Sequence, residues 1–143
     1  MKNIVFIALL FLTSCIDKST LNNSFPSQLL HGNSAKVWII KESSDSNDKN
    51  ISALNNYLKS FIFYSNQRFR DQELIHLGSK EGQKGIYSIK KDKYEKIILH
   101  LSYSEGDRRN FVIQEISNTK LTLQSLNGSR ATLELSSLKP PKL

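Results

Sequence analysis

Short segments rich in β-branched and aromatic residues, separated by turn signals, fill most of the chain from residue 60 onwards. Together with one earlier segment around Trp38, they predict about eight strands, at 36–41, 60–65, 68–77, 85–90, 94–103, 110–116, 121–126 and 130–138. Asn127 and Gly128 form the strongest hairpin signal among the connecting turns. No long helical period competes with this pattern, so the chain is predicted to be all-β.

Apolar side chains occupy alternate positions along these segments. In the segment 110–116, Phe111 and Ile113 alternate with Val112 and Gln114, and the later segments repeat the alternation. Antiparallel strands with one buried face and one solvated face show this pattern. Strands joined by short hairpins favour an antiparallel up-and-down β-barrel of about eight strands, because closure removes the exposed edges. A β-sandwich is the alternative.

The region between the first and second predicted strands has a different character. Residues 41–50 are polar and show no period, which predicts a long loop. After this loop, Ile51, Leu54 and Leu58 are spaced as on one face of a helix. A short helical turn is therefore expected after the first strand.

The first residues of the chain have the layout of an export signal. Lys2 supplies a positive charge, residues 4–12 are apolar, and the small residues Thr13 and Ser14 precede Cys15. The apolar run is too short to cross a bilayer, which takes about 20 residues. This order resembles the bacterial lipobox, in which the cysteine is acylated, for example with palmitate, and becomes the new N-terminus. An ordinary secreted protein with an incidental cysteine is the alternative.

These features divide the chain into four expected parts. They are a lipoprotein signal peptide 1–14, a lipidated N-terminus and tether 15–34, a barrel domain 35–139 and a C-terminal tail 140–143. Pro140 and Pro141 cannot continue a strand, so the last strand is expected to end before them. Within the tether, the apolar residues Phe25, Leu29 and Leu30 are candidates to dock on the domain.

Cysteine usage and charge exclude several function classes. Cys15 is the only cysteine, so its acylation leaves no disulfide, thiol nucleophile or thiolate metal site in the domain. The formal charge is +7, and the densest cationic clusters, at 90–96 and 107–109, also contain acidic residues. An exported protein with such scattered cations is not expected to bind nucleic acid. Attraction to anionic lipid headgroups explains the positive charge.

Residues suited to acid–base or metal chemistry are scattered along the chain. His31, His76 and His100 are isolated in sequence, whereas a zinc site needs several converging ligands. No serine lies in a nucleophile elbow, and no glycine-rich loop leads into a helix. Asp71 and Glu73 share a strand face, where exposure to solvent is favoured over an inward position. No catalytic residue, metal or cofactor is expected, so the protein is predicted not to be an enzyme.

Four stretches together resemble a known family. HGNSAKVWII, FIFYSNQRF, KGIYSI and FVIQEISNTKLTLQ occur in this order along the chain, and they are similar to the lipocalin-like lipoproteins of Bacteroidota. The resemblance implies a lipocalin-like barrel with the segment 41–59 as its first, lid-forming loop. It also implies that Trp38 is a structural plug at the base of the barrel. It implies little about the ligand, because one fold serves many functions.

The first hypothesis for function is a small lipophilic ligand bound at the mouth of the barrel. Its hypothetical wall residues are Phe61, Phe63, Tyr87, Ile98 and Phe111. Aromatic side chains at such positions, Phe69 included, also serve as core filler. Membrane attachment would come through lipidated Cys15 in the cell envelope. The residue after it is Ile16 and not Asp, which by enterobacterial sorting logic favours the outer membrane over the inner one.

The alternative hypothesis is an interaction or assembly module of the envelope. It would use the exposed basic loops at 90–96 and at Arg108 and Arg109 against an acidic protein partner or lipid headgroups. A filled barrel interior favours this alternative, because function would then have to lie on the loops.

Overall fold

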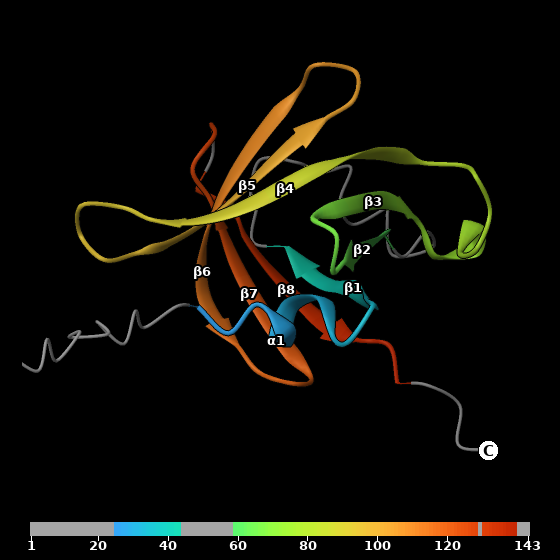
Figure 1. Cartoon of the computed structure of the whole chain (residues 1–143), viewed down its shortest axis with the longest axis horizontal. Coiled ribbons are helices and arrows are strands. Elements are labelled where there is room, and N and C mark those ends of the chain that lie inside the picture. The colour runs from blue at the N-terminus through green and yellow to red at the C-terminus, as the bar shows by residue number, and fades with distance from the viewer. Residues whose placement is uncertain (1–24, 44–58, 129, 140–143) are drawn as a thin grey trace, which may run out of the picture.

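The computed structural model describes residues 25–43, 59–128 and 130–139. Within these ranges the chain forms eight strands and two short helical elements (Figure 1). In chain order they are α1 Gln28–His31, β1 Ala35–Ser43, β2 Lys59–Tyr64, β3 Arg68–Glu73, the 3-10 helix η2 Leu74–His76, β4 Gln83–Lys91, β5 Ile97–Tyr103, β6 Arg108–Ile116, β7 Lys120–Ser125 and β8 Thr132–Ser137.

The eight described strands close into one barrel in the order β1 to β8. Every neighbouring pair is antiparallel, and β8 returns to β1 through the partners Trp38–Ser137 and Ile40–Leu135. The predicted all-β, up-and-down barrel is therefore confirmed, and the β-sandwich alternative is wrong. Among the described helices, none has the length and apolar character needed to cross a bilayer.

The predicted strands agree closely with the observed ones except at two ends. β5 begins at Ile97 and not at residue 94, because residues 92–96 form the turn, and the second difference is the end of β3. The sequence pattern continues this strand over residues 74–77, but Leu74–His76 form η2 instead. The β3–β4 ladder ends at the partners Asp71 and Gln83. Beyond it, Gly78 and Gly82 have φ angles of 86° and 90°, which only glycine adopts easily, and they turn the chain back. η2 is a short helical piece after the first strand, whereas the helical turn predicted at 51–58 lies outside the described residues.

The core fills the inside of the barrel. The register places Trp38 opposite Phe61 and Phe63 opposite Phe69, so large rings meet across neighbouring strands. The buried cluster consists of Leu30, Trp38, Phe61, Phe63, Phe69, Tyr87, Leu99, Leu101, Tyr103, Phe111, Ile113, Leu121, Leu123 and Leu135. The alternation predicted for the last three strands is confirmed, because its apolar positions in β6 and β7 belong to this cluster and Leu133 packs against it.

The barrel has two different ends, which follow from its antiparallel order. The α1 end carries α1 and the turns at 65–67, 92–96 and 117–119. The far end carries the connections at 74–82 and 104–107 and the start of the β7–β8 turn at 126–128. In Figure 1 the β4–β5 turn and the β3–β4 connection lie on opposite sides of the molecule.

Helix α1 covers one end of the barrel and is held there by Trp38. Leu30 of α1 is fully buried in the core, and Trp38 Nε1 donates a hydrogen bond of 2.8 Å to the Leu30 carbonyl. Lys36 Nζ donates to the Leu29 carbonyl at 2.9 Å and lies 4.3 Å from the Trp38 ring centroid. Burial lowers the pKa of Lys36. These contacts support the structural role that the resemblance implies for Trp38.

The last part of the expected tether belongs to the folded domain. Phe25 is half-buried and packs against the core, and Leu30 lies inside it. The expected docking of these two apolar residues is therefore confirmed. Docking fixes the place where the chain enters the barrel, at the α1 end.

Candidate ligand-binding site

The structure brings four of the five hypothetical wall residues into the barrel interior. Phe61, Phe63, Tyr87 and Phe111 are buried members of the core cluster. Ile98 is different: its neighbour Leu99 points into the core, so Ile98 lies on the outer face of β5, between Lys90 and Val112. The expectation that Ile98 lines the interior is corrected by this register.

The aromatic side chains of the interior contact one another. Phe63 lies at ring-centroid distances of 5.9 Å from Phe61 and 6.3 Å from Phe69, and it meets the Tyr87 ring edge-on at 5.2 Å. Phe69 in turn meets the Tyr103 ring edge-on at 5.0 Å. These are normal distances for packed aromatic pairs. The rings therefore fill the part of the barrel enclosed by β2, β3, β4 and β5.

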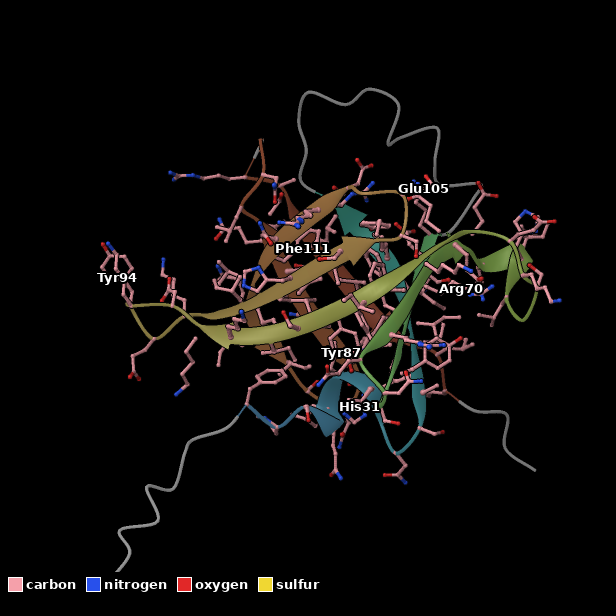
Figure 2. All side chains as sticks on the ribbon, turned by 45° about the horizontal axis from the view of Figure 1, so that its top comes forward. His31, Arg70, Tyr87, Tyr94, Glu105 and Phe111 are labelled. Carbon is pink, nitrogen blue, oxygen red and sulfur yellow. The ribbon has the colours of Figure 1, made fainter. Side chains whose placement is uncertain are left out.

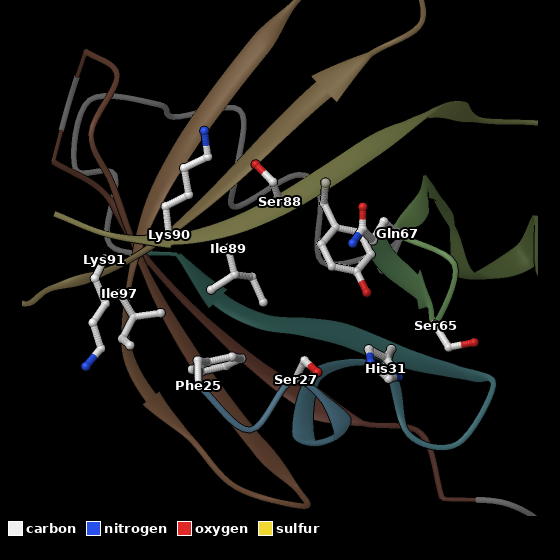
Figure 3. Close-up of a pocket in the computed structure, with 11 residues that line it drawn as sticks. Phe25, Ser27, His31, Ser65, Gln67, Ser88, Ile89, Lys90, Lys91 and Ile97 are labelled. Carbon is white, nitrogen blue, oxygen red and sulfur yellow. The ribbon is translucent and has the colours of Figure 1, made fainter. Parts of the chain in front are cut away.

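A cavity of about 660 Å³ lies at the α1 end, between α1, the β2–β3 turn and the base of the β4–β5 hairpin. It exists because β4 is longer than its neighbour β3. The last paired residue of β4 on that side is Ile86, opposite Arg68, although Tyr87 N still donates to the Gln67 carbonyl at 2.8 Å. Past this point β4 runs on without β3, and α1 stands opposite it (Figure 3).

The lining of the cavity combines apolar and polar residues. Its apolar residues are Phe25, Tyr87, Ile89 and Ile97. The polar lining residues are Ser27, His31, Ser65, Gln67, Ser88, Lys90 and Lys91. Figure 3 shows Ile89 and Ile97 on the side of Phe25, whereas Ser88 and Lys90 point away across β4. Such a lining suits a lipophilic molecule with a polar or acidic group.

Hydrogen bonds fix the side chains of Tyr87 and His31 at the edges of the cavity. The Tyr87 hydroxyl donates to the Tyr64 carbonyl at 2.8 Å, and burial raises the pKa of Tyr87 to about 12. His31 Nδ1 lies 2.6 Å from the Gly32 carbonyl oxygen, so in the tautomer with a proton on Nδ1 it donates there. Its Nε2 is then available as an acceptor.

A polar cluster of Asp71, Tyr103 and Arg109 lies at the far end of the barrel. The Tyr103 hydroxyl donates to Asp71 Oδ2 at 2.9 Å, and Arg109 Nη1 lies 3.6 Å from the same oxygen. The Arg109 guanidinium also stands 4.9 Å from the Tyr103 ring centroid. Only 11% of the Asp71 side chain is exposed, so Asp71 points inward, against the sequence-based preference for exposure. Arg109 likewise takes part in this cluster and is not simply a loop cation.

The tyrosine environments predict a loss of stability at alkaline pH. Burial, followed by the charge of Asp71, raises the pKa of Tyr103, while Arg109 acts in the opposite direction. Unfolded tyrosine titrates near pH 10. The neutral phenols of Tyr87 and Tyr103 therefore stabilise the fold fully below about pH 10. The contribution of Tyr87 is lost as the pH rises through about 12, and that of Tyr103 is lost at a higher pH.

The measurement is the urea midpoint as a function of pH. We expect it to fall steadily above pH 10, and to fall less steeply in Tyr87→Phe than in the matched control Tyr94→Phe at the exposed hairpin tip. Equal slopes in the two variants would show that Tyr87 titrates alike in the folded and unfolded chain.

The three histidines have separate partners. His31 bonds to Gly32, His76 Nδ1 lies 2.8 Å from Glu81 Oε2, and His100 Nδ1 lies 2.7 Å from Asn110 Oδ1. Among the described residues, no group of three or more His, Cys, Asp or Glu side chains is arranged to hold a metal ion. His100 shares the outer face of β5 with Ile98, so it does not point inward.

No protein-family model matches the chain, and no curated protein matches it. The candidate site therefore depends on the geometry alone.

Sequence reasoning missed most of the cavity. Of the hypothetical wall residues only Tyr87 lines it. Two further apolar lining residues carried a usable signal: Ile89 continues the alternation of Tyr87, and Phe25 is an isolated aromatic residue in a polar stretch. The polar lining residues Ser27, Ser65 and Gln67 carried none, because they come together only when α1 docks beside the β2–β3 turn.

Proposed function

We propose that the protein is a non-catalytic lipoprotein of the cell envelope, anchored through Cys15, whose lipocalin-like barrel binds a small lipophilic ligand. The binding site of this proposal is the cavity beside α1, and not the centre of the barrel. The observation that carries it is the combination of a cavity of about 660 Å³ with an apolar side formed by Phe25, Tyr87, Ile89 and Ile97.

The size and lining of the cavity support this choice. Ligand pockets usually measure about 300–1,000 Å³ and combine apolar walls with a few polar groups. Lys91 and His31, from opposite sides of the cavity, supply a cation and a hydrogen-bonding ring. A fatty acid or a similar lipophilic acid is the ligand class that matches both features. The rings in the barrel centre already contact each other, so they leave the α1 cavity as the better site.

Two variants test the cavity with a fluorescent fatty acid such as cis-parinaric acid. Ile89→Glu places a carboxylate on the apolar side, and Ser65→Trp fills the cavity from an exposed turn. Burying an unpaired charge is costly, so we expect binding at least about tenfold weaker in Ile89→Glu, and a similar loss in Ser65→Trp.

The matched control is Ile86→Glu, on the same strand but with 62% of the residue exposed. It should bind the fatty acid like the unmodified protein. Thermal unfolding of each variant separates loss of the site from loss of the fold, and Ser65→Trp is expected to keep the unmodified melting temperature. Equal binding by all four proteins would disprove the cavity as the ligand site.

A further inference from the structure

The β4–β5 hairpin extends beyond the barrel at the α1 end. Residues past Ile86 have no ladder partner on the β3 side, and the hairpin turns at 92–96. Figure 2 shows Tyr94 at one extremity of the molecule, with Arg70 and Glu105 on the opposite side. The tip is therefore a projecting surface that is free of neighbouring described strands.

The turn at the tip is held by Asp92. Its Oδ1 accepts hydrogen bonds from the backbone N–H groups of Tyr94, at 2.7 Å, and Lys96, at 2.9 Å. The Asp92 carbonyl also accepts from Glu95 N at 3.1 Å, and Glu95 takes a φ of 63°. One of the two acidic side chains of the tip is thus used to close the turn.

Apart from the exposed Glu95, the side chains presented by this turn are cationic and aromatic. Tyr94 is 69% exposed, and Lys93 Nζ lies 4.9 Å from its ring centroid. Lys90, Lys91 and Lys96 are exposed as well, and none of these lysines takes part in an ion pair within the described chain. The result is a fixed turn that presents one exposed aromatic ring among four lysines without ion-pair partners.

Charge is distributed unevenly between the two ends of the barrel. The acidic residues Glu73, Glu81, Glu105 and Asp107 all belong to the far end, where they lie among its cations. At the α1 end, Asp92 is engaged in the turn, Glu115 is paired with Lys120 at 3.1 Å, and the exposed Glu95 stands among the four hairpin lysines. The α1 end is therefore the side of the barrel that an anionic surface attracts.

We propose that the β4–β5 hairpin docks the α1 end of the barrel on a bilayer containing anionic lipids. Lysines near an anionic surface gain a favourable interaction with the headgroups, and a tyrosine ring is well suited to the headgroup level. Phe25, where the described chain begins, lines the same cavity as Lys90 and Lys91, so the chain enters the barrel beside the hairpin.

Docking at this end fits the proposed lipid anchor. An extended chain advances about 3.5 Å per residue, so the segment from Cys15 to Phe25 spans at most roughly 35 Å. The docked orientation turns the ligand cavity towards the membrane, from which a lipophilic ligand would enter. The match between the docked orientation and the lipid anchor rests on the proposed lipoprotein function. Membrane binding by the hairpin lysines and Tyr94 does not rest on it, because these residues act without the anchor.

The test uses a chain that begins at Ile16, which lacks the anchor but keeps all described elements, since these lie between residues 25 and 139. Sedimentation measures binding to vesicles of phosphatidylethanolamine with phosphatidylglycerol, and to vesicles of phosphatidylcholine alone. We expect binding to the anionic vesicles only, and weaker binding at high salt because salt screens charges.

Charge reversal locates the docking surface. In Lys93→Glu/Lys96→Glu, partitioning to anionic vesicles should fall roughly 25-fold or more, because each lysine near an anionic surface contributes a factor of about five. The matched control Lys80→Glu/Lys84→Glu carries the same net charge, but its changes are exposed positions at the far end. The control should lose far less than the hairpin variant.

The role of the aromatic ring is tested by Tyr94→Trp. Its tryptophan fluorescence should be quenched by brominated lipids, whereas Trp38 is buried and should not be quenched. Equal losses in the two charge-reversal variants, or no binding to anionic vesicles, would overturn the proposal. Binding to poly-glutamate but not to vesicles, through the same lysines, would also overturn it and would assign the hairpin to an acidic protein partner. Each of these results leaves the fatty-acid test of the cavity unaffected.

Discussion

Replacing Trp38 with Ala is expected to lower the free energy of unfolding by about 4 kcal/mol, within the range for large aromatic residues removed from a core. Trp38 is fully buried, faces Phe61 on β2 and Ser137 on β8, and holds α1 through its hydrogen bond to Leu30. One substitution therefore removes core packing at the closure of the barrel and the main polar attachment of α1. Urea unfolding followed by circular dichroism measures the loss.

Trp38→Phe separates the two contributions. Phe keeps most of the ring but cannot donate to the Leu30 carbonyl, so a buried acceptor loses its partner at a cost of about 1–3 kcal/mol. Because α1 forms one side of the cavity, Trp38→Ala should also abolish fatty-acid binding in the remaining folded protein. A loss below about 1 kcal/mol in Trp38→Ala would contradict the assignment of Trp38 as the structural plug.

Gly85→Ala is expected to cost about 3 kcal/mol, at the upper end of the usual range for overpacked cores. A Cβ atom at Gly85 would collide with the Ser102 carbonyl oxygen on β5 and would lie 2.7 Å from Phe69 Cε1. Gly85 is the strand partner of both Phe69 and Tyr103, and the absence of its side chain lets those two rings meet at 5.0 Å. The measurement is again the urea midpoint.

The matched control is Gly128→Ala. A Cβ atom there meets nothing within 4 Å, but φ is 68°, so only backbone strain of about 1–2 kcal/mol is expected. If Gly85→Ala were no more destabilising than Gly128→Ala, β4 would be shifting easily against β5, and the packing described for Phe69 and Tyr103 would be contradicted.

The sequence was sufficient to predict the barrel because its signals are local. Alternation in β6, β7 and β8 assigns the inner face, and hairpin turns such as Asn127-Gly128 set the antiparallel order. The end of β3 was mispredicted for a non-local reason. Residues 74–77 are apolar enough for a strand, but the ladder with β4 has already ended at Asp71 and Gln83, so β4 offers them no partner.

The candidate site was harder to predict because it depends on unequal strand lengths and on α1. Alternation identified Tyr87 and the other interior rings, but it cannot show that these rings fill the barrel. The inward position of Asp71 depends on Tyr103 and Arg109, which are distant in sequence. The cavity itself results from β4 extending beyond β3. This difference in strand length cannot be predicted from either segment of the sequence alone.

The most direct test of ligand binding is native mass spectrometry of the full-length protein gently extracted from its own envelope, compared with its denatured mass and with Ile89→Glu. We predict a small-molecule adduct on the unmodified protein that is lost on denaturation and missing from Ile89→Glu, together with a covalent acyl mass on Cys15 in both. A protein without an adduct, or an equal adduct on Ile89→Glu, would contradict the proposed ligand cavity.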